Sequence, residues 1–169
     1  MWETNRLILK PLNYAQLVKY IKADLSLENE LHLKESKRTI SDELKEALEQ
    51  TILPGVADTS KNYLYSTLWT IISKADNMMV GDLCIVGEPN TAGEIEIGYG
   101  TYEAYQGRGF MTEAVEGIIQ WAETQPHVKA VVASTEKSNI ASFTVLFKNG
   151  FQKTGESETM FMWGKKLKG

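Results

Sequence analysis

Residues 106–111, which read QGRGFM, are of types that suit the binding of a phosphate group. Gly107 and Gly109 let successive backbone N–H groups point into one concavity and leave no side chain to keep an anion out. Arg108 between them adds a cation. An apolar pattern typical of a helix follows directly, and the helix dipole adds partial positive charge at the same place. The loop therefore predicts an anion site at a helix start.

The start of this helix also lacks a capping side chain. The first backbone N–H groups of any helix have no acceptor within the helix. No Ser, Thr, Asp or Asn stands at the position where a side chain could cap them. An external anion would satisfy these groups. There is no third glycine for a dinucleotide-binding fingerprint and no G-K-[ST] ending for a P-loop, so the anion belongs to another class of ligand. An ordinary tight turn is the alternative interpretation of the loop alone.

Length, charge and composition narrow the class of protein. The 169 residues fit one domain spanning 1–169, and the net charge of −4 argues against a nucleic-acid partner. The N-terminus has no signal-peptide plan, and no apolar run approaches the roughly 18 residues that cross a bilayer. We expect a cytoplasmic protein without a membrane partner. Two histidines and a single cysteine predict no dedicated metal site, and Cys84 is interpreted as a buried core residue.

The elements that must position the loop follow from hydrophobic periodicity, caps and turn residues. Residues 24–40 are mixed and charged, and we expect them to be irregular or partly helical. Expected in the first half are a strand over 6–12, a helix over 14–23 capped by Asn13, a helix from Ser41 that ends before Pro54, and strands over 63–73 and 78–87 joined by a hairpin at 75–77.

The second half alternates strands and helices. Residues 94–100 alternate with period two, and their closing glycines indicate a bulge or a close approach to the backbone. The other expected elements are a helix after Gly109, a strand over 130–135, a helix over 139–149 stopped by Gly150, and terminal strands near Phe151 and over 160–167. The fold class is α+β: a mixed, mostly antiparallel sheet in a three-layer arrangement with helices, containing one strand-helix-strand crossover.

Several segments in this order resemble the GNAT superfamily of acetyl-CoA-dependent N-acetyltransferases. QGRGF after EIEIGYG is similar to that family's pyrophosphate loop, and NIASFTVLFKNGF follows it. The RimJ/RimL-like branch is the more specific resemblance. It has an opening ET-RL-L-P strand, here Glu3 to Pro11, and an N-x-x-S before a K-x-G-F ending, here Asn139, Ser142, Lys148, Gly150 and Phe151. Together these segments span the whole chain.

The resemblance implies the rest of a site for acetyl-CoA. In the family, the strand at 94–100 splays from the strand at 130–135, and the pantetheine arm lies in the opening. The same strand's amides suit an oxyanion that forms when the amine attacks. The implied cofactor contacts are the backbone of Ile97, Gly98 and Tyr99, the loop residues Gln106, Gly107, Arg108, Gly109, Phe110, Met111 and Thr112, and the side chains of Asn139 and Ser142.

Each implied contact has a structural alternative in the sequence. Asn139 is a good helix N-cap in its own right, and Ser142 is a polar residue of a first helical turn. Tyr99 suits packing in an alternating strand. Glu94 and Glu96 alternate with apolar residues, which is also the pattern of a solvated strand face.

Two chemical roles remain to be filled in the implied reaction. Glu96 is the first candidate for the base that removes a proton from the amine, with His32 and Glu158 as weaker candidates. Many members of the family protonate the departing thiolate with a tyrosine four residues before the glycine of the GF ending, and here that residue is Leu146. Ser142 or a water is the candidate replacement, and Tyr102 and Tyr105 are less favoured.

The acceptor is expected to be a primary amine, either a protein N-terminus or a small molecule. The resemblance assigns acceptor choice to residues 14–52 and 87–93, whose mixed charges do not define its sign. A non-catalytic acyl-CoA-binding or sensing module is the alternative function, and a structural interaction protein is a third. Members of the family are often monomers or homodimers, and we expect one of these states.

Overall fold

The computed structural model describes residues 1–168, and its centre is an 8-stranded sheet in the order β1-β2-β3-β4-β5-β6-β8-β7. Neighbouring strands are antiparallel except β5 and β6, which are parallel. The mostly antiparallel prediction with one crossover is thereby confirmed. The strands are β1 Trp2–Glu3, β2 Leu7–Pro11, β3 Leu68–Ser73, β4 Met78–Ile85, β5 Glu94–Thr101, β6 Ala130–Glu136, β7 Gln152–Glu156 and β8 Met160–Lys166.

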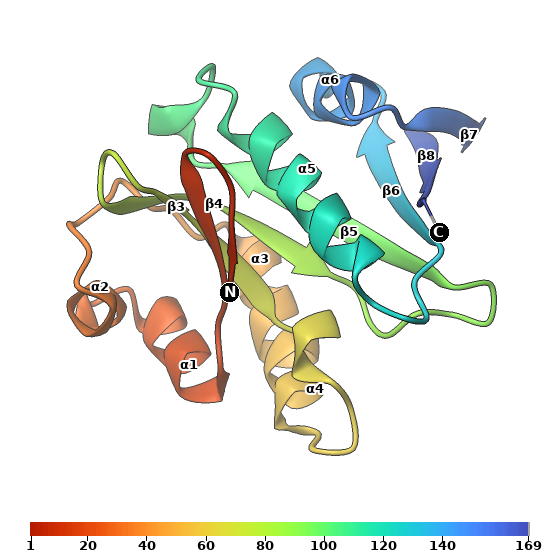
Figure 1. Cartoon of the computed structure of the whole chain (residues 1–169). Helices are drawn as coiled ribbons and strands as arrows, with labels where there is room; N and C mark the ends of the chain where they lie inside the picture. The colour runs from red at the N-terminus through yellow and green to blue at the C-terminus, as the bar shows by residue number, and fades with distance from the viewer. Residues whose placement is uncertain (169) are drawn as a thin grey trace.

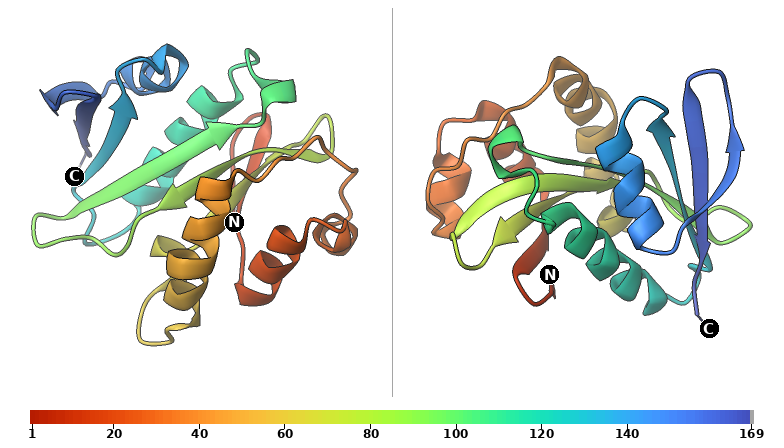
Figure 2. Two further views of the ribbon diagram at one scale, coloured as in Figure 1. Left: turned by 180° about the vertical axis from the view of Figure 1, so that it is seen from behind. Right: turned by 90° about the horizontal axis from the view of Figure 1, so that it is seen from above.

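Helices cover both faces of the sheet, which gives the expected three layers (Figures 1 and 2). α1 to α4 lie on one face, and α5 and α6 lie on the other. The helices are α1 Tyr14–Lys22, α2 Ser26–Leu31, α3 Asp42–Ala47, α4 Leu53–Ala57, α5 Phe110–Glu123 and α6 Ile140–Lys148. A π-helical turn, Leu48–Ile52, joins α3 to α4, and 3₁₀ turns occupy Tyr63–Tyr65 and Glu103–Tyr105.

Alternation along the strands divides the apolar residues between two cores. Ile95 and Ile97 of β5 are buried in the larger core, together with the apolar stripe of α5. A second core gathers α1, the α3–α4 region and the opposite face of β3 and β4, with Tyr20 and Leu48 fully buried. Cys84 is partly buried and packs against this second core, where burial raises the pKa of its thiol to about 12.

The start of α5 is attached to the N-terminal strands. The Glu113 carboxylate accepts hydrogen bonds from Arg6 Nε at 2.7 Å and from the Arg6 backbone N–H at 2.8 Å. It also accepts a bond from the Thr4 hydroxyl. Gly117 allows the helix to lie close to β2, because a Cβ there would lie 2.9 Å from Leu9 Cδ1. These contacts fix where the glycine loop stands relative to the sheet.

Two predicted boundaries are wrong. The helix from Ser41 does not end before Pro54 but continues to Ala57. Leu53 N–H bonds to Leu48 O, five residues back, so the proline falls in the first turn of α4, where no N–H is needed.

The strand expected from residue 63 begins instead at Leu68. The Asn62 side chain accepts a bond from Leu64 N–H and closes a 3₁₀ turn before the strand. The bulge considered for residues 94–100 is also absent from the β4–β5 pairing, which is regular from Gly81 opposite Thr101 to Ile85 opposite Ile97. The strand β1 was not predicted.

Candidate active site

The glycine loop has the backbone that the sequence predicts for an anion site. Gly107 and Gly109 have φ of +81° and +76°, the left-handed region that favours glycine. Gly109 is the N-cap of α5, with no side-chain cap bond. The helix's first backbone bond joins Glu113 N–H to Gly109 O at 3.2 Å, and among residues 1–168 the N–H groups from Gly107 to Thr112 have no acceptor. A row of unused donors therefore faces outward at the positive end of the helix dipole.

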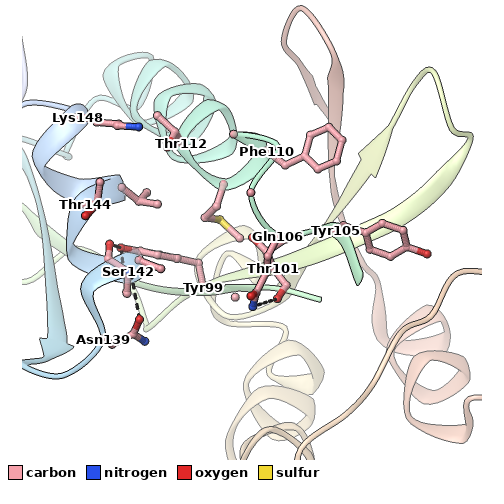
Figure 3. Close-up of a pocket in the computed structure, with 16 residues that line it drawn as sticks. Tyr99, Thr101, Tyr105, Gln106, Phe110, Thr112, Asn139, Ser142, Thr144 and Lys148 are labelled. Atoms are coloured by element: carbon pink, nitrogen blue, oxygen red, sulfur yellow. Dashed lines mark hydrogen bonds between the residues drawn. The ribbon is translucent and has the colours of Figure 1, made fainter. Parts of the chain in front are cut away.

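These donors border a cavity of about 400 Å³ between the start of α5 and one side of α6, which lines it from its N-cap to its last residue (Figure 3). Most of the predicted cofactor residues line it. They are Tyr99, Gln106, Gly107, Gly109, Phe110, Met111, Thr112, Asn139 and Ser142. The cavity also has lining residues to which the sequence reasoning gave no cofactor role, among them Thr101, Tyr105, Thr144, Val145 and Lys148. Lys148 is the lysine of the K-x-G-F ending, and this motif is the sequence signal that could have identified it.

One end of the cavity carries a small polar cluster. Tyr99 Oη donates to Ser142 O at 2.8 Å, and Ser142 Oγ lies 3.4 Å from Tyr99 Oη. Asn139 Oδ1 accepts a bond from Ser142 N–H at 3.1 Å, so Asn139 is the N-cap of α6 and lines the cavity at once. Partial burial raises the pKa of Tyr99 to about 12, and the Ser142 contact lowers it in part. Tyr99 therefore stays protonated at neutral pH.

Four predicted site residues do not line this cavity. The Ile97 side chain is 3% exposed in the core, and Gly98 has no side chain to contribute. Glu96 is exposed and, by alternation along β5, lies on the sheet face opposite to Ile95 and Ile97. Arg108 points elsewhere, with its Nη2 3.1 Å from Asp76 Oδ2 on the β3–β4 hairpin.

The backbone of β5 nevertheless has an open edge beside the cavity. β5 pairs with β6 only from Glu94 opposite Ala130 to Glu96 opposite Val132, although both strands continue further. Beyond that point the two strands separate, as the family resemblance implies. The backbone from Ile97 to Tyr99 therefore pairs with β4 on one side and with no strand of the described chain on the other.

A second polar cluster lies in the opposite core and was not predicted. Tyr20 Oη donates to Asp82 Oδ2 at 2.5 Å and Tyr102 Oη donates to Asp82 Oδ1 at 2.9 Å. All three residues are buried. Burial raises the pKa of the Asp82 carboxyl to about 6 despite the two hydrogen bonds. Tyr102, a less favoured candidate proton donor, is thus engaged away from the cavity.

The other candidates also have defined positions, and Glu158 is exposed in the turn between β7 and β8 and does not line the cavity. Leu146, which stands where a tyrosine is common, is fully buried in the core. His32 has φ of +57° at the end of α2, and its carbonyl accepts a bond from Asn77 Nδ2. Tyr105 lines the cavity, and its hydroxyl accepts a bond from Lys37 N–H at 2.9 Å. Among residues 1–168 no group of three or more His, Cys, Asp or Glu side chains is arranged to hold a metal ion.

Fold, loop and strand opening together define a GNAT domain. Residues 6–152 match the family described as acetyltransferase (GNAT) domain, and the chain belongs to this family. It is 32% identical over 95 residues to the uncharacterized N-acetyltransferase YjdG of Bacillus subtilis (strain 168). That alignment covers 56% of this chain and 56% of the relative, so the chain spans little more than half the length of the curated relative it matches.

Solved structures of ribosomal-protein acetyltransferases share the fold. The ribosomal-protein-S5-alanine acetyltransferase of Vibrio fischeri has a TM-score of 0.70 and 20% identity, covering 98% of this chain and 95% of that chain. RimL, a ribosomal L7/L12 alpha-N-protein acetyltransferase solved in complex with coenzyme A, has a TM-score of 0.67 and 17% identity, covering 97% and 96%. As for membranes, none of the helices in the described residues has the length and apolar character to cross one.

Proposed function

We propose that this protein transfers the acetyl group of acetyl-CoA to a primary amine. The observation that carries the proposal is the row of N–H groups from Gly107 to Thr112, which have no acceptor within residues 1–168 and stand at the edge of a cavity of about 400 Å³. In a GNAT domain, this arrangement suits the pyrophosphate of acetyl-CoA, because backbone donors and a helix dipole together bind anions.

The other predicted contacts fit a cofactor of this shape. The open edge of Ile97, Gly98 and Tyr99 offers backbone groups to an extended pantetheine arm. Asn139 and Ser142 line the cavity from α6, whereas the glycine loop lines it from the start of α5. The cavity therefore combines a phosphate-binding part with a part that carries a hydroxyl group. Acetyl-CoA supplies an acyl group on a good leaving group, and the protein's part is to hold the reacting atoms and move protons.

The reaction needs an unprotonated amine and an acceptor for the developing charge. In our proposal Glu96 takes the proton from the ammonium form of the acceptor, directly or through water. The amine nitrogen then bonds to the thioester carbon, the backbone N–H groups of Ile97 and Tyr99 stabilise the oxyanion, and the carbon–sulfur bond breaks. The attacking nitrogen becomes cationic and gives up its second proton to the Ser142 hydroxyl or to a water that this hydroxyl orders. The same hydroxyl or water passes a proton to the departing sulfur, so that Ser142 ends the reaction protonated, while the Tyr99 hydroxyl stays close to its Oγ.

The first test is the change in melting temperature with excess acetyl-CoA, with ATP and NAD as controls. Saturation at a hundred times the dissociation constant adds about 2.7 kcal/mol, or roughly 5 to 11 °C for a domain of this size. A selective shift is expected for acetyl-CoA. Turnover of any amine then distinguishes an enzyme from an acyl-CoA-binding module. The feature that favours the binding module is the buried Leu146, which stands where many members of the family have a tyrosine.

Glu96→Gln tests the proposed base. The rate of acetyl transfer should fall most at low pH, where fewer acceptor molecules are already unprotonated. Glu94→Gln is the matched control, because both glutamates lie on the same face of β5. An unchanged rate across the pH range in Glu96→Gln, or an equal loss in the control, would remove Glu96 from the mechanism.

The acceptor is proposed to be a protein N-terminus or a small primary amine. The structural neighbours named for acetylating ribosomal proteins favour a protein N-terminus as the first class to screen. A cytoplasmic location, a monomeric or homodimeric state and the lack of a nucleic-acid partner stay predictions from the sequence. Size-exclusion chromatography with light scattering measures the oligomeric state directly.

A further inference from the structure

Arg108, the cation expected to face the phosphate, is already engaged with other groups. Its Nη2 lies 3.1 Å from Asp76 Oδ2, and its guanidinium lies 4.5 Å from the centre of the Phe110 ring. The Ser73 hydroxyl and Arg108 hold the pKa of Asp76 below its usual range, so this carboxylate is ionised at neutral pH. The positive charge of Arg108 is thus balanced by the β3–β4 hairpin and is directed away from the cavity.

Lys148 is a cation that does line the cavity. It is the last residue of α6, it is exposed, and within residues 1–168 no carboxylate lies within salt-bridge distance of it. Figure 3 shows its side chain extending from α6 toward Thr112 in the first turn of α5. Its ammonium group is therefore free to meet an anion held by the α5 N–H groups.

The end of α6 is fastened to the same turn of α5. Asn149 Nδ2, from the residue after Lys148, donates to Thr112 O at 3.1 Å. Lys165 Nζ of β8 donates to Asn149 O at 2.9 Å, which holds this residue from the other side. The backbone that carries Lys148 thus has a defined position relative to the unpartnered donors of the glycine loop, whatever the freedom of the lysine side chain.

We propose that Lys148, and not Arg108, is the side-chain cation that binds a phosphate of coenzyme A. The inference rests on the proposed function in that it takes CoA as the ligand. A lysine ammonium is a compact point charge on a flexible stem, which suits a phosphate at the rim of a cavity. Arg108 instead joins the glycine loop to the β3–β4 hairpin through Asp76.

The test is the dissociation constant of CoA, measured by calorimetry on the full chain. Lys148→Gln should weaken binding about three- to tenfold at low salt, and Lys148→Glu should weaken it further. The matched control is Lys22→Gln, because Lys22 is also the exposed last residue of a helix, α1. Lys22→Gln and Arg108→Gln should each change the constant by less than about twofold.

The outcomes separate this inference from the proposed function. If the wild-type protein binds no CoA, both fail together. If the wild type binds CoA and Lys148→Gln binds it equally well, or if Arg108→Gln causes the larger loss, only the role of Lys148 is overturned.

Dephospho-CoA, which lacks the 3′-phosphate, identifies the phosphate concerned. A loss that persists with dephospho-CoA assigns Lys148 to the pyrophosphate, and a loss that disappears assigns it to the 3′-phosphate. Raising the salt concentration should shrink the difference between wild type and Lys148→Gln, because the contact is exposed to screening.

Discussion

Two polar clusters lie near the end of β5, and each contains a tyrosine of this region, but they differ in burial and in charge. Tyr102, just after the strand, shares the Asp82 carboxylate with Tyr20, and their two hydroxyls lie 3.1 Å apart in the core. Tyr99, within the strand, bonds to the carbonyl of Ser142 at the wall of an open cavity. One cluster is closed and contains a buried carboxylate, while the other is open and uncharged.

The difference shows how neighbouring tyrosines come to have separate tasks. In the closed cluster both tyrosine hydroxyls have a partner, and the Arg38 guanidinium lies 4.3 Å from the centre of the Tyr20 ring. The cluster therefore connects α1 to β4 and to Tyr102, in the segment that leads from β5 to the glycine loop. In the open cluster the Ser142 hydroxyl faces space that a ligand can fill. We therefore expect substitutions in the closed cluster to affect stability, and those around the cavity to affect binding and rate.

The largest effect is expected from Asp82→Ala. The change leaves the hydroxyls of Tyr20 and Tyr102 buried without their carboxylate, which should cost about 3 kcal/mol of unfolding free energy. The melting temperature should fall by roughly 6 to 12 °C. Asp42→Ala, at an exposed aspartate of α3, is the control and should shift the melting temperature far less. Equal shifts in the two variants would contradict a stabilising role for the closed cluster.

Gly107→Val, in contrast to Asp82→Ala, should affect the affinity for CoA more than the stability. A side chain at φ +81° strains the loop and projects into the space proposed for the phosphate, so the affinity for CoA should fall about a hundredfold. Gly87→Val is the matched control, because Gly87 has φ +87° and equally open space around its Cβ position. Both variants should lose similar stability by thermal melting, and only Gly107→Val should lose affinity. Loss of CoA binding in both would point to strain alone.

The pKa of Asp82 predicts a pH dependence of stability. Because burial raises this pKa from 3.8 to about 6, the neutral carboxyl is favoured in the folded state. Its contribution is fully present below pH 3.8 and is lost as the pH rises through about 6. Relative to Asp82→Asn, which does not titrate, the wild type should lose about 2 kcal/mol between pH 4 and pH 7. Melting curves of both proteins across this range measure the difference, and a constant difference would show that Asp82 does not titrate there.

The smallest effects are expected from removing single hydroxyls. Tyr102→Phe should lower the unfolding free energy by about 1 kcal/mol and leave the acetylation rate per folded molecule unchanged. Tyr99→Phe removes the bond to Ser142 and should lower the rate a few-fold with a smaller change in stability. Denaturant unfolding and steady-state kinetics on both variants test the contrast, which fails if Tyr102→Phe slows the reaction more than Tyr99→Phe does.

Local sequence was enough to predict most of the elements. Periodicity and caps placed α1, α5 and α6 close to their observed bounds, and Asn13 and Asn139 are both observed N-caps. The glycine loop was predicted because positive φ and a missing cap are properties of a few consecutive residues. At Pro54 the local signal for a helix end was misleading. The π-helical turn Leu48–Ile52, for which no short sequence pattern is known, lets the helix continue past the proline.

Only the tertiary structure decided which side chains meet. Tyr20, Asp82 and Tyr102 come from α1, β4 and the loop after β5, and nothing in their spacing announces a shared cluster. Arg108 lies between the loop glycines in sequence, yet its guanidinium forms an ion pair with Asp76 of the β3–β4 hairpin. Lys148 reaches the cavity because α6 ends against the first turn of α5. Backbone conformation is set by near neighbours, whereas the partner of a charged or hydroxyl group depends on how the elements pack.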